Sequence, residues 1–167
     1  MPFLTIGNVT TGRLDFTGTR FVPRTYFDSL DHRRVPAKGD ILYTVVGATY
    51  GRPVSVDDHR EFRVQRHIAI LRPDGSCDRD YLLLFLRSPL AYEQATASIT
   101  GTAQPTVALK PLRSFVVPVP PVAEQRRIVA KVEHLMKLCD DLKAQLRRTD
   151  ETAGQLVEAV AAKLVAA

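Results

Sequence analysis

The chain has 167 residues, 45% of them hydrophobic, and a formal net charge of +5 at pH 7, which predicts one folded globular domain with an appendage. Two cysteines, Cys77 and Cys139, are too few for a disulfide framework or a zinc site, and the longest apolar stretch, near Leu82–Leu86, is too short to span a bilayer. The first residues lack the basic leader and apolar core of a signal peptide, so we expect a soluble, cytoplasmic protein with reduced thiols.

Short apolar runs separated by turn residues predict a series of strands in the first part of the chain. Lys38–Asp40, for example, leads into an apolar run that suits a buried strand. Further along, leucines at helical spacing predict a helix over Asp80–Ala97, kinked at Pro89. The result is a mixed α+β domain over residues 1–117. The expected strands are Phe3–Val9, Arg13–Phe16, Ile41–Val46, Arg52–Val56, Arg66–Leu71, Val107–Leu109 and Phe115–Val117, with a helical turn at Tyr26–Leu30.

Prolines mark a boundary after this domain. Proline fixes φ and has no N–H, so residues 118–121 (PVPP) predict a stiff hinge, and Pro121 suits the first turn of a helix. Apolar or small residues then recur at alternating spacings of four and three, which is the a/d pattern of a coiled coil and predicts one helix over residues 122–166. Thr149 and Ala153 complete this seam. Its apolar members are Ile128, Val132, Leu135, Cys139, Leu142, Leu146, Leu156 and Val160.

A helix of this length needs a partner. It would be roughly 65 Å long at ~1.5 Å per residue, and the sequence contains no second helix able to cover its apolar seam. We therefore expect a symmetric antiparallel homodimer through the C-terminal helix.

Charge is unevenly distributed along the sequence. Residues 121–167 hold eight basic and seven acidic side chains, whereas residues 1–120 hold fifteen basic and eleven acidic ones, thirteen of the basic ones being arginine. Arginine forms bidentate hydrogen bonds with phosphates and guanine edges, so this excess favours nucleic acid as a partner. The alternative is an ordinary solvated face.

Two glycine-bounded loops and one strand supply the candidate DNA contacts. Gly47–Gly51 lacks the Lys-Ser/Thr of a P-loop, so it is either a glycine turn or a place where another backbone approaches closely. Alternation along Arg63–Ile70 predicts that Arg63, Gln65 and His67 share one face. Gln65 and Gln104 are equally open to a structural role. The candidates are Thr49, Tyr50 and Arg52 in the first loop, Arg63, Gln65 and His67 on the strand, and Thr102, Gln104 and Lys110 at the second loop.

The sequence contains no convincing catalytic motif. The four histidines show no metal-ligand spacing, and Asp141 and Lys143 flank a seam position of the helix, which identifies them as ordinary exposed charges rather than nuclease residues. Pro120–Pro121 lacks the flanking residues of an amino-methyltransferase loop, and there is no glycine motif for S-adenosylmethionine. We expect no catalytic activity, no cofactor and no metal.

Several segments together resemble one family, the specificity subunits of type I restriction–modification systems. The most specific is Val117–Ile128 (VPVPPVAEQRRI), which carries the prolines and the Glu-Gln pair at the helix start. The other matching segments, in chain order, are Ile6–Leu14, Gly39–Leu42, Gln65 with Ile68–Pro73, Tyr81–Leu82, Leu86 with Ser88, and Gly101–Gln104.

The resemblance implies a target-recognition domain that reads half of a bipartite DNA site, followed by a helix that spaces two such domains. It also implies docking of methyltransferase subunits and, through them, the restriction subunit. With one such pair and no usual first segment before Phe3, the sequence predicts a half-subunit or fragment. The alternative is a truncated paralogue that dimerises and occupies or regulates the methyltransferase.

Overall fold

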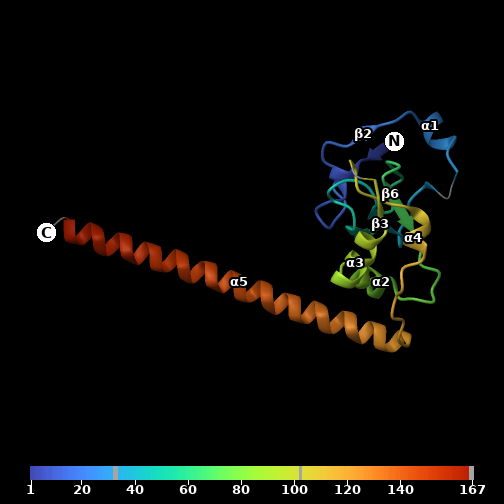
Figure 1. The fold of residues 1–167 in the computed structure, drawn as a ribbon. Coiled ribbons are helices and arrows are strands. Elements are labelled where there is room, and N and C mark those ends of the chain that lie inside the picture. Colours follow the sequence, from blue (N-terminus) through green and yellow to red (C-terminus); the bar gives the residue numbers. More distant parts are fainter. Residues whose placement is uncertain (32–33, 102, 166–167) are drawn as a thin grey trace. The chain divides into compact units, whose positions relative to one another are not determined.

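The structure, a computed structural model, describes residues 1–31, 34–101 and 103–165 (Figure 1). It contains two compact units, Met1–Arg126 and the part of the chain that begins at Arg127. Helices and small sheets are mixed in the first unit, and a long helix ends the chain, which confirms the predicted α+β class.

The N-terminal sheet has the strand order β2-β1-β5, in which β1 (Pro2–Leu4) pairs antiparallel with β2 (Arg20–Phe21) and parallel with β5 (Arg63–Val64). The predicted strand Phe3–Val9 ends at Leu4, because the Asn8 side chain accepts a hydrogen bond from the Thr5 backbone N–H at 2.9 Å and closes the 3₁₀ turn η1 (Ile6–Asn8). The predicted return strand Arg13–Phe16 is wrong. The segment that pairs is β2, further along the chain.

The central sheet has the order β4-β3-β6, with β3 (Ile41–Thr44) antiparallel to both β4 (Pro53–Ser55) and β6 (Ile68–Leu71). All four residues of β3 are buried. The strand alternates between two hydrophobic clusters: Ile41 and Tyr43 lie in one, and Leu42 lies in the other with Leu4 of the N-terminal sheet. Both faces of β3 are therefore covered, which explains its continuous apolar sequence.

Two helices replace the single kinked helix expected over Asp80–Ala97. Asp78 caps α2 (Arg79–Leu86), accepting hydrogen bonds from two backbone N–H groups, and Ser88 caps α3 (Pro89–Ala97), with Pro89 in its first turn. Ser88 has an extended backbone (φ −76°, ψ 155°), so the chain breaks the helix there rather than bending it. In Figure 1, α2 and α3 lie at one end of the first unit and β2 and α1 at the other.

The remaining elements of the first unit are short. The helix α1 (Arg24–Asp28) corresponds to the helical turn expected near Tyr26, and α4 is a single turn at Leu109–Arg113. A two-stranded hairpin is formed by β7 (Ile99–Thr100) and β8 (Thr106–Val107), and Thr106 also bridges to Val46.

Side chains of α2 and α3 hold the segment that leads to the prolines. Gln94 exchanges two hydrogen bonds with the backbone of Val116, at 2.7 and 3.1 Å, and the Tyr81 hydroxyl donates to the Pro118 carbonyl at 2.8 Å. The expected strand Phe115–Val117 is therefore absent from the described sheets, because side chains satisfy its backbone instead of a neighbouring strand.

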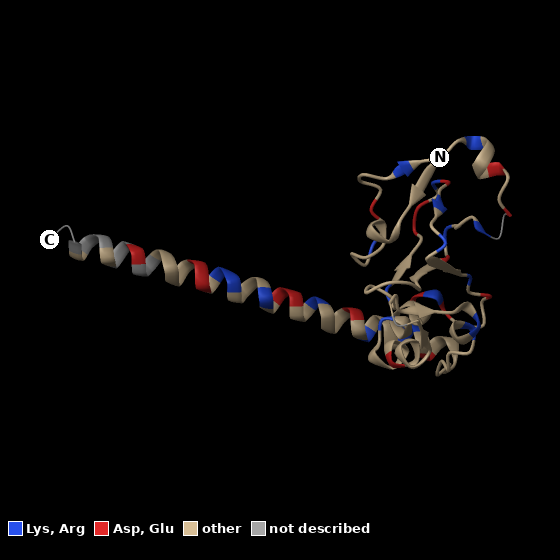
Figure 2. Cartoon of the chain, turned by 45° about the horizontal axis from the view of Figure 1, so that its top comes forward, with Lys and Arg blue, Asp and Glu red and all other residues tan. Residues whose placement is uncertain are grey.

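The helix α5 runs over Val122–Val165, and its first turn is anchored by Gln125. The fully buried Gln125 amide accepts from the Asp78 N–H and donates to the Pro120 carbonyl, both at 2.7 Å. The prediction of one continuous helix is confirmed up to Val165, and Ala166 lies outside the described residues. Figure 2 shows acidic and basic residues interleaved along α5. In the described part of the chain, no helix has the length and apolar character needed to cross a membrane.

Candidate nucleic-acid interface

Three loops that are far apart in the sequence meet at the C-terminal end of β3. Val45 donates its N–H to the His67 carbonyl at 3.0 Å and accepts from the Val107 N–H at 2.8 Å. Two residues later, Gly47 donates to the Pro105 carbonyl at 2.9 Å. These bonds bring together three segments, which we call the loop edge: Gly47–Arg52, Gln65–His67 and Ala103–Pro105.

Most of the sequence-predicted contacts belong to this loop edge. Thr49, Tyr50 and Arg52 come from its first segment, Gln65 and His67 from its second, and Gln104 from its third, whereas Thr102 lies outside the described residues. Arg52 and Gln104 are exposed and the other four are half-buried.

The two glutamines, Gln65 and Gln104, differ in exposure and in hydrogen bonding. Gln104 is exposed, and its side chain forms no hydrogen bond with any residue that the structure describes. Its amide is therefore available to a ligand. Gln65 is half-buried, and its backbone bonds to Leu4 and Ile68 hold the turn that separates β5 from β6.

Arginines surround a turn next to the loop edge. Arg52 donates through Nη1 to the Thr10 carbonyl at 3.0 Å, and Arg87 donates through Nη2 to the Gly12 carbonyl at 3.4 Å. Within residues 1–31, 34–101 and 103–165, neither guanidinium pairs with a carboxylate. Exposed Arg13 follows Gly12 in the same turn. The charges of Arg52 and Arg87 are therefore not neutralised by an ion pair, unlike those of Arg24, Arg60, Arg72 and Arg79, which form ion pairs.

A tyrosine of α3 joins the loop edge and was not predicted from the sequence. The rings of Tyr50 and Tyr92 are stacked, 5.3 Å apart at 7°. Tyr50 Oη shares a 2.9 Å hydrogen bond with Thr96 Oγ1, and this bond holds the pKa of Tyr50 below its ordinary value. The only sequence signal for Tyr92 was an aromatic residue beside the buried Ala91 and Ala95 positions of α3.

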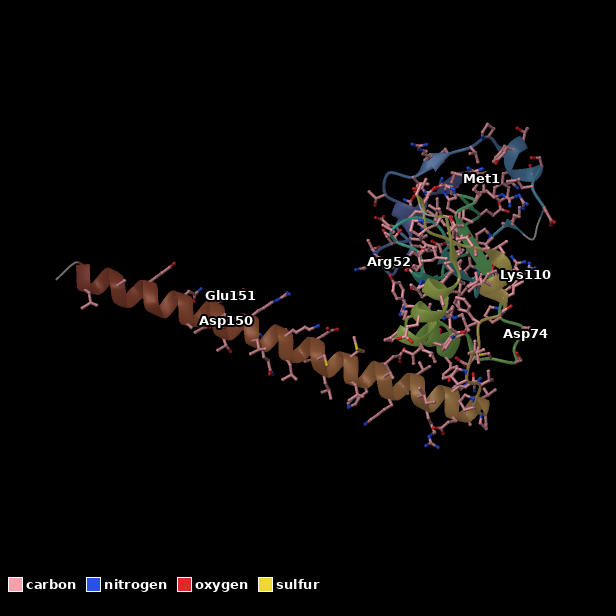
Figure 3. All side chains as sticks on the ribbon, in the orientation of Figure 1. Met1, Arg52, Asp74, Lys110, Asp150 and Glu151 are labelled. Atoms are coloured by element: carbon pink, nitrogen blue, oxygen red, sulfur yellow. The ribbon has the colours of Figure 1, made fainter. Side chains whose placement is uncertain are left out.

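Lys110 lies away from the other candidates. It is an exposed residue of the short helix α4, and Figure 3 shows Lys110 and Arg52 on opposite sides of the first unit. Its proximity in sequence to the second loop is therefore misleading, because α4 turns the chain away after Val107. Lys110 is therefore not part of the loop edge.

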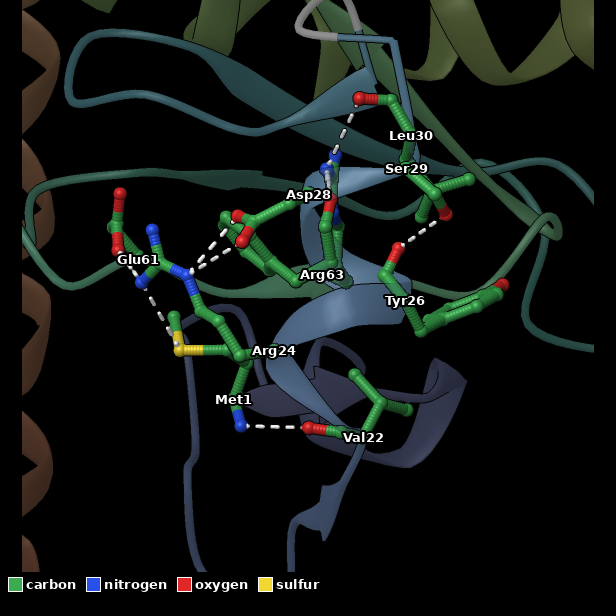
Figure 4. Close-up of polar contacts among 10 residues, drawn as sticks. Met1, Val22, Arg24, Tyr26, Asp28, Ser29, Leu30, Glu61 and Arg63 are labelled. Carbon is green, nitrogen blue, oxygen red and sulfur yellow. Dashed lines mark hydrogen bonds and ion pairs between the residues drawn. The ribbon is translucent and has the colours of Figure 1, made fainter.

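The prediction that Arg63 shares a polar face with Gln65 and His67 is wrong. Only 2% of it is exposed, and Nη2 donates to the Phe27 carbonyl, with a second, longer bond of 3.5 Å to Leu30 (Figure 4). Its guanidinium lies 4.3 Å from the centre of the Phe27 ring, and burial lowers its pKa. The alternation from Arg63 to His67 fails because β5 ends at Val64 and a turn follows. Arg63 holds α1 on the N-terminal sheet and cannot contact DNA from this position.

The predicted seam lies along α5. Ile128 and Val132 are half-buried, Leu135, Cys139, Leu142 and Leu146 are exposed, and the side chains of Leu156 and Val160 lie outside the described ones. Met136 and Leu138, which lie outside the predicted a/d positions, are 56% and 46% exposed. The apolar surface of α5 is therefore wider than an a/d stripe in this region.

Metal ligands do not gather in the described ranges. No group of three His, Cys, Asp or Glu side chains comes close enough there to hold an ion. A surface groove next to the Thr10–Arg13 turn is lined by charges of both signs, among them Arg60, Asp57 and Asp58. Arg60 pairs with Asp58 at 2.8 Å and covers the Phe16 ring at 4.2 Å, so its charge is already engaged.

Comparison with known proteins gives one consistent result. The family model of the type I restriction modification DNA specificity domain matches residues 1–149. The specificity subunit of the type I restriction enzyme EcoBI of Escherichia coli is 27% identical over 164 residues, which cover 98% of this chain and 34% of that protein. The EcoKI specificity subunit of Escherichia coli strain K12 is 28% identical over 171 residues, covering 97% and 36%. The chain thus spans about a third of the length of these relatives.

Solved structures share the fold. The HsdS subunit of Thermoanaerobacter tengcongensis superposes with a TM-score of 0.68 at 23% identity, over 93% of this chain and 40% of that one. A chain from a structure concerned with complex assembly and conformational transition of the type I R-M system gives 0.69 at 24% identity, with the same coverage.

Proposed function

The chain belongs to the type I restriction modification DNA specificity family, and we propose that it is a non-catalytic module that recognises one half of a bipartite DNA site and docks methyltransferase subunits. Double-stranded DNA is its ligand, and no cofactor takes part. The restriction subunit joins through the methyltransferase. The observation that carries this proposal is the loop edge, where three separate loops present polar side chains beside unpaired arginines.

The residue types of the loop edge suit the reading of base edges. Arginine and glutamine form bidentate hydrogen bonds with guanine and adenine in the major groove, and threonine hydroxyls bond to several bases. Arg52 and Gln104 are exposed for such contacts, and His67 lies on the other side of β3 from Arg52. Side chains from separate loops on one rigid sheet can contact successive base pairs without rearrangement.

The arginines near the Thr10–Arg13 turn suit phosphate contacts. Arg52 and Arg87 each use one N–H on a backbone carbonyl, which orients the guanidinium and leaves its other donors for a ligand. Phosphate contacts fix the position of a protein on duplex DNA, and base contacts supply specificity. The loop edge and this turn therefore support both parts of DNA recognition within one unit.

The helix α5 supports the docking part of the proposal. Its first turns carry exposed charges of both signs at positions on several faces, a composition that suits a polar protein interface. We assign methyltransferase docking to this region. The charged residues concerned are Arg126, Arg127, Lys131, Glu133 and Lys137.

The apolar seam of α5 supports a homodimer. Leu135, Leu142 and Leu146 are 47%, 59% and 65% exposed, and large apolar side chains at this spacing are stabilised by a partner helix. An antiparallel pair of two α5 helices would place two recognition units on one assembly, as a bipartite DNA site requires.

Methyl transfer by a reconstituted complex tests the proposed function. The purified chain is mixed with its methyltransferase subunits, labelled S-adenosylmethionine and duplex DNA, and each component is omitted in turn. We expect label in DNA only when the chain and the methyltransferase are both present. Transfer by the chain alone would refute the non-catalytic assignment. A stable complex with the methyltransferase that has no affinity for DNA would favour the second interpretation, an interaction module that occupies the methyltransferase.

A further inference from the structure

The stacked pair Tyr50–Tyr92 is held in place from several sides while Tyr92 stays exposed. Tyr92 is 49% exposed although its ring lies parallel to that of Tyr50. Gly51 has φ +83°, and a Cβ at this position would lie 3.0 Å from Tyr92 Cδ2. The glycine thus both permits the turn and leaves room for the ring. Thr96 bonds to the Tyr50 hydroxyl and to the Tyr92 carbonyl, at 2.9 and 2.8 Å. An exposed ring fixed in this way loses little freedom when a ligand covers it.

The surroundings of the pair are basic and belong to the loop edge. Tyr50 and Arg52 flank Gly51 in the first segment of the edge, and Arg52 and Arg87 both bond to the Thr10–Gly12 turn. The neighbouring Tyr50 hydroxyl raises the pKa of Tyr92, and the positive charge of Arg52 acts in the opposite direction. An aromatic face beside unneutralised arginines suits a ligand that combines an apolar surface with negative charge, as the sugar–phosphate backbone of DNA does.

We propose that Arg87, which follows α2, and Tyr92, on α3, belong to the DNA-contacting surface: Tyr92 packs against the deoxyribose of one nucleotide, and Arg87 contacts a phosphate next to it. This inference rests on the proposed DNA recognition and extends it to two residues that lie outside the predicted loops. A deoxyribose is the same at every position of the DNA, so the apolar contact with Tyr92 adds affinity rather than specificity.

The test compares Tyr92→Leu with Tyr26→Leu in the full chain. Tyr26 is a matched control, because it is 45% exposed and lies on a short helix in the N-terminal part of the unit. Binding to a fluorescent duplex of about 30 base pairs with mixed sequence is followed by anisotropy at several salt concentrations. We expect Tyr92→Leu to weaken binding roughly 3- to 15-fold with an unchanged salt slope, because less apolar area is buried, and Tyr92→Phe and Tyr26→Leu to bind like the parent chain.

Arg87 has its own control. Arg87→Gln should lower the slope of log affinity against log salt by about one, whereas Arg113→Gln, on α4, should leave the slope unchanged. Thermal unfolding of each variant checks that the fold is retained. Tyr92→Phe keeps the ring and shows whether the hydroxyl matters, and Arg87→Gln tests the same surface if leucine disturbs the turn at Gly51.

The outcomes separate this inference from the proposed function. Absence of salt-dependent DNA binding by the parent chain, alone and with methyltransferase, would overturn the proposed function itself. Normal binding by Tyr92→Leu and Arg87→Gln, with a binding parent chain, would overturn only the inference. A Tyr92→Leu variant that binds DNA normally but loses the methyltransferase would assign the tyrosine pair to a protein partner and would also overturn it.

Discussion

Arg52 and Arg63 are both candidate DNA contacts by sequence, but their surroundings in the structure are opposite. Arg52 is exposed and bonds to one carbonyl of a surface turn, whereas Arg63 is buried under α1 against Phe27. An exposed guanidinium has N–H groups that can donate to a phosphate, whereas a buried guanidinium can donate only to groups of the protein. Among the described residues, Nε and Nη1 of Arg63 have no hydrogen-bond partner, so its burial is only partly compensated.

This contrast predicts different responses of DNA binding. Arg52→Ala should lower DNA affinity, either on all sequences with a salt slope smaller by about one, as for a phosphate contact, or by about 1–3 kcal/mol on the cognate site alone, as for a base contact. Arg63→Met, which keeps the volume and removes the buried charge, should leave the salt slope unchanged. Anisotropy titrations at several salt concentrations measure both. Equal slope losses in the two variants would contradict the placement of Arg63.

Tyr43 provides a prediction about pH. Its hydroxyl is buried without a hydrogen-bond partner in the described structure, and this burial raises the pKa of Tyr43 to about 12. The folded state therefore holds the proton more tightly than the unfolded chain, whose tyrosine titrates near pH 10. Stability from this group is complete below pH 10 and is lost as pH rises from 10 towards 12.

Tyr43→Phe should remove that alkaline loss. We expect its free energy of unfolding at pH 7 to be equal to or up to about 1 kcal/mol above that of the parent chain, because an unpaired buried hydroxyl is removed without a change of shape. Denaturant unfolding at neutral pH and at pH values above 10 measures this difference. A marked loss of stability at pH 7 would show that the hydroxyl has a partner.

At the scale of elements, the proline segment is an anchored connection. Gln94, Tyr81 and Gln125 bind successive stretches of its backbone, and each side chain belongs to a helix. Three prolines remove backbone donors from this segment, so its carbonyls need partners from elsewhere. Gln125 is the second residue of the Glu-Gln pair in Val117–Ile128, the segment that most specifically resembles the family. Its physical role is to bind two backbone groups, the Asp78 N–H and the Pro120 carbonyl.

Gln125→Ala should be strongly destabilising. It leaves the Asp78 N–H and the Pro120 carbonyl without their partner, at a cost of roughly 2–4 kcal/mol. Gln145→Ala is the matched control, because Gln145 is exposed in the same helix and should change stability by less than about 0.5 kcal/mol. Chemical denaturation of the two variants makes the comparison. Similar small effects would contradict the anchoring role.

At the scale of the whole molecule, α5 leaves apolar surface that the chain does not cover within the described structure. Leu135, Leu138, Leu142 and Leu146 are all close to half exposed or more. Leucine burial contributes about 1.5–3 kcal/mol for each side chain, so a stripe of this kind supports stable pairing of helices. We propose that a second copy of α5 covers this surface.

The predicted assembly is a dimer that one seam substitution dissociates. We expect light scattering at tens of micromolar to give twice the mass of the 167-residue chain, 18.6 kDa. Leu142→Asp should reduce this to one mass, because it places a charge on the apolar seam. Lys143→Asp, one residue away and outside the seam, should remain dimeric. A monomeric parent chain would contradict the proposal.

The sequence by itself determined what local chemistry controls. Proline suits the first turn of a helix, and heptad spacing defines one face of a helix, so the start of α5 after Pro121 and its extent could be predicted. The buried run Ile41–Thr44 and the glycine turns also depend mainly on nearby residues. The family resemblance followed from such local strings, because each retains its residues in order.

Tertiary structure alone decided which loops meet and which charges remain exposed. The loop edge depends on the pairing of β3 with β6 and on the bridge between Val46 and Thr106 of β8, and these contacts link residues more than twenty positions apart. Arg63 was misplaced because a turn at Gln65–His67 interrupts the alternation, and Tyr92 was missed because its partner Tyr50 lies on another element. These strand pairings are stabilised by the packing of the two hydrophobic clusters. The packing energy depends on the whole core rather than on any short segment.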